Sequence, residues 1–123
     1  MKNAILVIED NEQNMYLCDY ILTNNGYTVL QARTGRDGID MAIAHQPDLI
    51  ILDIQLPEMD GYAVARELKR MSETKAIPIV AVTSYAMMGD RERVLEAGCE
   101  GYMEKPINPQ TFAEEVEKHL LKT

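Results

Sequence analysis

The residues of this chain with the clearest capacity for chemistry are carboxylates that directly follow apolar runs. The run Leu49–Leu52 ends in Asp53, and an earlier run over residues 4–8 ends in Glu9 and Asp10. If these runs are parallel β-strands, their carboxyl ends meet at one edge of a sheet, where α/β proteins place their sites. Three neighbouring carboxylates repel one another unless a cation lies among them. We therefore predict a Mg²⁺ site, because Mg²⁺ prefers carboxylate and other hard oxygen ligands.

Two further polar residues are expected at the same edge. Thr83 ends a later apolar run, and Lys105 follows another short one. A nucleophilic carboxylate, a metal ion, a hydroxyl and an ammonium are together the groups needed to form an aspartyl phosphate at Asp53. The metal ion and the lysine would neutralise the charge on the phosphoryl oxygens. Considered one at a time, these residues could instead be ordinary helix caps and strand ends.

The segments around these residues alternate between strand-length apolar runs and stretches with helical periodicity. Strands are expected over residues 4–8, 27–30, 49–52, 77–82 and 101–103. A helix is expected after each strand: the first ends near Asn25, the second at Pro47 and the fourth at Gly98, and the last begins at Asn108 or Pro109. The alternation predicts a doubly wound (βα)5, flavodoxin-like α/β fold. This fold is a three-layer sandwich with a parallel sheet in the order 2-1-3-4-5.

Length and composition indicate a single domain over residues 1–123, with no room for a separate output domain. The formal net charge of -8 argues against nucleic acid and anionic membranes as partners. We find no signal peptide or membrane-spanning run, so a cytoplasmic protein is expected. Cys18 and Cys99 match no metal-ligand spacing and are expected to be buried thiols. His45 and His119 are expected to be solvated residues near helix ends.

Four motifs, in this order and spacing, resemble the CheY-like receiver domains of two-component response regulators. They are Val7-Ile8-Glu9-Asp10-Asn11, Leu52-Asp53-Ile54-Gln55-Leu56-Pro57 with Gly61, Val82-Thr83-Ser84, and Lys105-Pro106. The resemblance extends over the whole chain. The first two motifs are most similar to DivK-type single-domain regulators and to receivers attached to hybrid kinases.

The resemblance implies a phosphorelay protein rather than an enzyme. Asp53 would accept a phosphoryl group from a phosphohistidine on a sensor histidine kinase or a histidine phosphotransfer protein. Glu9, Asp10, Asp53 and the backbone carbonyl of Gln55 would bind Mg²⁺, for which Mn²⁺ can substitute.

The resemblance also implies a switch. Lys105 and Thr83 would contact the phosphoryl group, and Tyr102 would be the switch aromatic. The Lys105–Pro106 peptide bond would be cis. A downstream protein would then bind the face formed by the fourth helix, fifth strand and fifth helix.

Several rival functions fit the residues less well. A phosphatase with an aspartate nucleophile needs an acid at position 55, where Gln55 cannot donate a proton. A flavodoxin needs a phosphate-cradling loop after the first strand, but residues 9–12 of this loop are largely acidic. No G-x-G-x-x-G motif indicates a dinucleotide site. The serious alternative is a protein-interaction module whose phosphorylation is vestigial, and the complete set of site residues argues against it.

Tyr85 and Gln55 are expected to tune autodephosphorylation, because a bulky ring two residues after Thr83 would shield the phosphoryl group from water. We predict that Tyr85→Ala shortens the half-life of the phosphorylated protein. The measurement is the decay of phosphoprotein after removal of the phosphodonor. An unchanged or longer half-life in Tyr85→Ala would contradict the shielding role.

Overall fold

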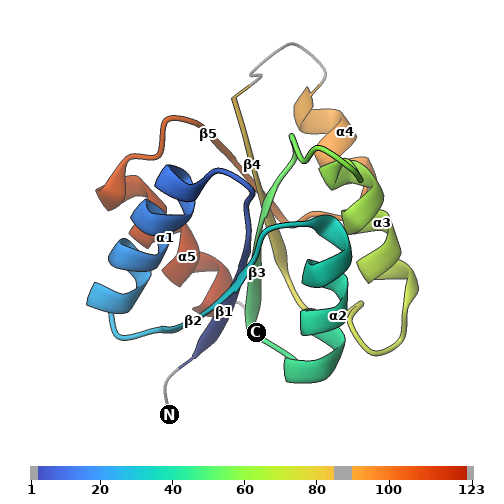
Figure 1. Ribbon diagram of the computed structural model, residues 1–123, viewed down its shortest axis with the longest axis horizontal. Helices are drawn as coiled ribbons and strands as arrows, with labels where there is room; N and C mark the ends of the chain where they lie inside the picture. The colour runs from blue at the N-terminus through green and yellow to red at the C-terminus, as the bar shows by residue number, and fades with distance from the viewer. Residues whose placement is uncertain (1–2, 85–89, 122–123) are drawn as a thin grey trace.

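A sheet of five parallel strands forms the centre of the computed structural model, which describes residues 3–84 and 90–121 (Figure 1). The sheet has the strand order β2-β1-β3-β4-β5, so the predicted topology is confirmed. Its elements are β1 (Ala4–Ile8), α1 (Glu12–Asn24), β2 (Thr28–Ala32), α2 (Gly35–His45), β3 (Leu49–Asp53), α3 (Gly61–Arg70), β4 (Ile79–Thr83), α4 (Asp90–Glu96), β5 (Gly101–Glu104) and α5 (Pro109–Leu121).

The helices divide between the two faces of the sheet, as the colours of Figure 1 make clear. Helices α1 and α5 cover one face, where Met15, Phe112 and Val80 belong to one core cluster. Helices α2, α3 and α4 cover the other, where Leu68 and Val94 belong to the core. Strands β3 and β4 are buried along their whole length. This explains their continuous apolar sequences, because a central parallel strand has a helix layer on both sides.

Two strands begin later than predicted for local reasons, and every strand except β1 ends one or two residues later than predicted. Strand β4 begins at Ile79 rather than Ile77, after Pro78, whose nitrogen has no hydrogen to donate to a neighbouring strand. Strand β2 runs over Thr28–Ala32 because all five of its residues pair with β1. Tyr27, predicted to begin β2, instead donates its backbone N–H to Leu22 at the end of α1.

Side-chain caps fix where the helices begin. Asn11 accepts a hydrogen bond from the backbone N–H of Asn14 at 2.9 Å, and Thr34 and Asp60 cap α2 and α3 in the same way. Each cap satisfies one of the N–H groups that a first helical turn leaves without an internal partner. Asn11 and Thr34 lie within a few residues of the ends of β1 and β2, whereas Asp60 lies at the end of the longer loop between β3 and α3. No helix in the described ranges is long and apolar enough to cross a membrane.

His119 is buried, with only 4% of its surface exposed, so the expectation of a solvated side chain is wrong. The reason is Gly101 on β5, at which a Cβ would lie 2.4 Å from His119 Nε2. The missing side chain makes room for the imidazole ring, which lies 3.4 Å from a Glu115 carboxylate oxygen. The expectation for Cys18 and Cys99 is confirmed, since both are buried and free.

Gly61 gives a test of how tightly the loop after β3 is packed. A Cβ at Gly61 would lie 2.4 Å from Ile54 Cα and 2.7 Å from the Asp53 carbonyl oxygen. Because backbone atoms cannot move aside cheaply, we expect Gly61→Ala to lower the free energy of unfolding by about 1–3 kcal/mol. Urea denaturation measures this change. Gly26→Ala is the comparison. A Cβ at Gly26 would meet no atom within 4 Å, so any loss of stability there comes from the left-handed backbone conformation and not from packing. Wild-type stability in Gly61→Ala would contradict the packing.

Candidate functional site

The predicted carboxylates meet at the carboxyl end of the sheet. Strands β1 and β3 are neighbours, which brings Glu9 and Asp10 next to Asp53. One carboxylate oxygen from each residue lies within 4.8 Å of the others. Glu9 and Asp53 are only 3% and 2% exposed, whereas Asp10 is exposed to solvent. The site is therefore a buried pair of carboxylates with a third at its mouth.

Lys105 brings the ammonium group that the sequence predicted. Its Nζ lies 3.1 Å from Glu9 Oε1 and 3.3 Å from Asp53 Oδ1. The backbone N–H of Lys105 donates to the Thr83 carbonyl at 2.8 Å, which ties the residue to the end of β4. The Lys105–Pro106 peptide bond is cis, as the resemblance implied.

Burial and neighbouring charges shift the pKa values of groups in and near the site. Burial raises the pKa of Glu9 to about 7, and the hydrogen bond and negative charge of Asp53 add to the rise. Burial acts to lower the pKa of Lys105, but the charges of Asp53 and Glu9 outweigh it and raise that pKa. Burial, followed by the charge of Glu9, raises the pKa of the Cys18 thiol to about 12. The site therefore has more buried negative charge than its one lysine balances.

Backbone N–H groups hold the two buried carboxylates in fixed orientations. The N–H of Gln55 donates to Asp53 Oδ1 at 2.9 Å, and the N–H of Asn11 donates to Glu9 Oε2 at 3.2 Å. Each donor lies two residues after its acceptor, so each bond closes a short turn after a strand. These local turns act together with the contacts from Lys105 to orient the two side chains in the site.

The predicted switch residues lie beside this cluster. Thr83 is the last residue of β4 and is 1% exposed. Its hydroxyl accepts a hydrogen bond from the side-chain amide of Gln55, a contact that the sequence did not indicate. Tyr102 lies on β5 and packs partly buried against the core beneath α2, α3 and α4. Tyr85, named for phosphoryl shielding, lies outside the described residues.

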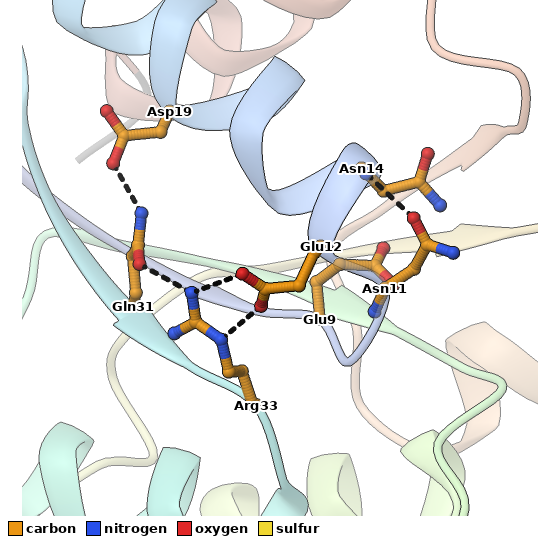
Figure 2. Close-up of polar contacts among 7 residues, drawn as sticks. All are labelled: Glu9, Asn11, Glu12, Asn14, Asp19, Gln31 and Arg33. Carbon is orange, nitrogen blue, oxygen red and sulfur yellow. Dashed lines mark hydrogen bonds and ion pairs between the residues drawn. The ribbon is translucent and has the colours of Figure 1, made fainter.

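A network of polar side chains at the rim was also absent from the sequence prediction. Figure 2 shows Gln31 of β2 bonded to Asp19 of α1 and to Arg33, which in turn contacts the Glu12 carboxylate. The hydrogen bond from Arg33 lowers the pKa of Glu12. Glu12 begins α1 just after the Glu9 turn, so the network braces the helix that borders the carboxylates. Pairing between residues 21 positions apart leaves no periodic signal in the sequence.

The donor set suits a magnesium ion. Three carboxylates offer hard oxygen atoms, and two of them are buried while the third borders solvent. The rise in the pKa of Glu9 reflects buried negative charge that a divalent cation would relieve. Mg²⁺ commonly binds through a few carboxylates and keeps waters in its other positions. The residues present therefore fit the ion that the sequence predicted.

The fold and this acidic site define a class of protein. The chain matches the response regulator receiver domain family over residues 5–117 and belongs to that family. The resemblance inferred from its motifs is thus confirmed. A receiver domain is a phosphoacceptor of two-component signalling rather than an enzyme, and it implies a histidine kinase as phosphodonor.

Individual relatives and solved structures within this family are similar to the chain over nearly its whole length. The chain is 42% identical over 120 residues to the polar-differentiation response regulator DivK of Brucella ovis, covering 98% of both chains. Its fold is similar to the signal receiver domain of a histidine kinase from Syntrophus aciditrophicus (TM-score 0.90, 33% identity, 98% of this chain and 92% of that one). It is also similar to the receiver domain of a Pseudomonas aeruginosa sensor histidine kinase (TM-score 0.90, 31% identity, 98% of both chains). That structure has a magnesium ion coordinated in its active-site cleft.

The raised pKa of Glu9 predicts how stability depends on pH. Its ordinary value is 4.5, so the folded, metal-free protein holds an extra proton between about pH 4.5 and 7. Stability is therefore lost as pH rises through this range. We expect Glu9→Gln to raise the free energy of unfolding at pH 8 by about 1–3 kcal/mol, and by less than about 1 kcal/mol at pH 5.

Urea denaturation in the presence of a chelator, at both pH values, measures this difference. Glu114→Gln is the control, because Glu114 is an exposed glutamate on α5. Equal effects of Glu9→Gln at pH 5 and pH 8 would show that Glu9 does not carry the extra proton.

Proposed function

We propose that this chain accepts a phosphoryl group from a partner phosphohistidine onto Asp53. The observation that carries the proposal is the buried Asp53 carboxylate, with Lys105 Nζ 3.3 Å from Oδ1 and two more carboxylates beside it. In the transfer, a lone pair of an Asp53 oxygen forms the new O–P bond. The P–N bond of the donor breaks, and its electron pair leaves with the imidazole nitrogen, which takes up a proton.

Glu9, Asp10 and Asp53, with the backbone carbonyl of Gln55, would hold Mg²⁺ in this reaction, and Mn²⁺ can substitute. The ion would supply positive charge that brings an anionic phosphoryl group to an acidic site. A magnesium-containing receiver structure at 31% identity supports this assignment.

The chain's own residues prepare Asp53 for the transfer. The N–H of Gln55 fixes one carboxylate oxygen, so the rotation of the side chain is restricted before the donor arrives. Lys105 contacts the same oxygen and would neutralise negative charge that moves onto the phosphoryl group. Burial of Asp53 limits access of water and strengthens these electrostatic contacts.

Phosphorylation would shift a conformational equilibrium through Thr83, Lys105 and Tyr102. A hydrogen bond to a charged group contributes about 1.5–3 kcal/mol. Moving a population from 1:99 to 99:1 needs about 5.5 kcal/mol. New bonds from Thr83 and Lys105 together only just reach that value, so some of the active conformation is populated before phosphorylation. The change would reach a downstream protein through the face formed by α4, β5 and α5.

Further parts of the proposal rest on the sequence. Residues 1–123 form a single receiver domain of a cytoplasmic phosphorelay, with a sensor histidine kinase or a histidine phosphotransfer protein as donor. Neither nucleic acid nor a membrane is a direct partner. Gln55 and Tyr85 tune the rate of autodephosphorylation.

The decisive experiment is phosphorylation with a small phosphodonor. We expect incubation with acetyl phosphate and Mg²⁺ to add one phosphoryl group, detected by intact mass spectrometry. The product should be absent with a chelator and absent in Asp53→Asn, because the nucleophilic oxygen is replaced by an amide. Asp40→Asn, an exposed residue on α2, should be phosphorylated like wild type. A wild-type protein that remains unmodified would favour the interaction module with vestigial phosphorylation.

A further inference from the structure

Gln55 contacts both the phosphoacceptor and the switch hydroxyl. Its backbone N–H donates to Asp53 Oδ1 at 2.9 Å. At the other end of the residue, the side-chain Nε2 donates to Thr83 Oγ1, and the side-chain Oε1 accepts the N–H of Ser84 at 3.1 Å. Both ends of the amide are therefore used to hold the end of β4. These contacts link segments 28 and 29 residues apart in the chain.

The two residues that Gln55 connects face opposite sides of the sheet. Successive side chains of a strand point to opposite faces. Val80 and Val82 of β4 pack toward α1 and α5, so Thr83 faces α3 and α4 with Ala81. Along β3, Ile51 packs toward α1 and α5, so Asp53 faces that side.

The residues around Thr83 also show that its side chain faces α3 and α4. Thr83 and Gln55 line a cavity of about 270 Å³, together with Tyr62 and Arg93 of α3 and α4. The Arg93 guanidinium lies 4.3 Å from the centre of the Tyr62 ring. Lys105 and Glu9, in contrast, contact Asp53 directly. The bond from Gln55 therefore holds the Thr83 hydroxyl on the side of the sheet away from the phosphoacceptor.

Moving Thr83 toward a phosphoryl group would break that bond. A hydroxyl has one hydrogen to donate and two lone pairs to accept with. Rotation of the Thr83 side chain toward Asp53 carries its oxygen away from the cavity and from Gln55 Nε2. The Gln55 bond thus stabilises the conformation in which the hydroxyl is unavailable to the phosphoryl group.

We infer that Gln55 is a positioning residue that holds the switch in its unphosphorylated conformation. The Gln55 latch, meaning the side-chain amide bound to Thr83 Oγ1 and the Ser84 N–H, opposes the rearrangement that phosphorylation drives. This inference rests on the proposed phosphoacceptor role of Asp53. It assigns to the Gln55 side chain a role separate from metal binding by its carbonyl and from any effect on hydrolysis.

Beryllium fluoride with Mg²⁺ tests the latch without hydrolysis, because it mimics a phosphoryl group on a carboxylate. Gln55→Met keeps the length of the side chain and removes both hydrogen bonds. A hydrogen bond contributes about 0.5–1.5 kcal/mol, so we expect this variant to bind beryllium fluoride about three- to tenfold more tightly than wild type. General loss of structure would weaken binding instead. Gln110→Met, an exposed position at the start of α5, should bind like wild type.

The Thr83→Val background shows whether the effect passes through the hydroxyl. In that background Gln55→Met should change the apparent Kd by less than about twofold, because the main bond to be broken is already absent. Equal or weaker binding by Gln55→Met alone would overturn the inference. A full tightening that persists in Thr83→Val would overturn it too, because Gln55 would then act by another route.

Hydrogen exchange of the ligand-free protein tests the latch independently of phosphorylation. We expect the Ser84 amide to exchange about three- to tenfold faster in Gln55→Met than in wild type, since its acceptor is removed. Equal exchange rates would mean that the latch does not form in solution. Failure of wild type to bind beryllium fluoride would contradict the proposed function, while the Ser84 exchange rate would still decide whether the latch exists.

Discussion

The contact of one ammonium group with two buried carboxylates is the constraint on which this end of the molecule depends. Burying an ionised group costs several kcal/mol unless opposite charge and hydrogen bonds compensate. Lys105 compensates only in part, as the pKa of about 7 at Glu9 indicates. The backbone N–H groups of Asn11 and Gln55 supply further compensation. The remaining imbalance makes the site receptive to a cation, and through a cation to an anionic phosphoryl group.

The fold offsets the cost of these buried charges by placing them at the carboxyl ends of strands that are otherwise wholly apolar. Strands β3 and β4 supply a rigid core, and only their last residues, Asp53 and Thr83, are polar. These two residues face opposite sides of the sheet, so under the proposed function a change at Asp53 would have to be passed from one face to the other. Gln55, in the loop between β3 and α3, contacts the Asp53 carboxylate through its backbone and the Thr83 hydroxyl through its side chain.

The features of the fold and site that depend on periodicity and strand order could be predicted from the sequence. Apolar runs and helical spacing predict the topology, and this topology places Glu9, Asp53 and Lys105 at one edge of the sheet, where they are in contact. Contacts that depend on particular side-chain rotamers were not predictable in this way. The amide of Gln55 could have faced solvent, and the burial of His119 depends on the space left by Gly101 on another element. The roles assigned to Tyr102 and Tyr85 stay predictions.

The rim network of β2 has a consequence for how the molecule behaves in a crowded solution. The sheet order leaves β2 as an edge strand, whose free backbone groups could pair with a strand of another molecule. Gln31 reaches from this edge to Asp19, and the charged Arg33 follows directly after the strand. These polar and charged side chains lie at the β2 edge, and a strand from another molecule would have to displace them in order to pair with β2. The network beside the acidic site therefore also makes strand pairing from another molecule less favourable at the β2 edge, one of the two edges of the sheet.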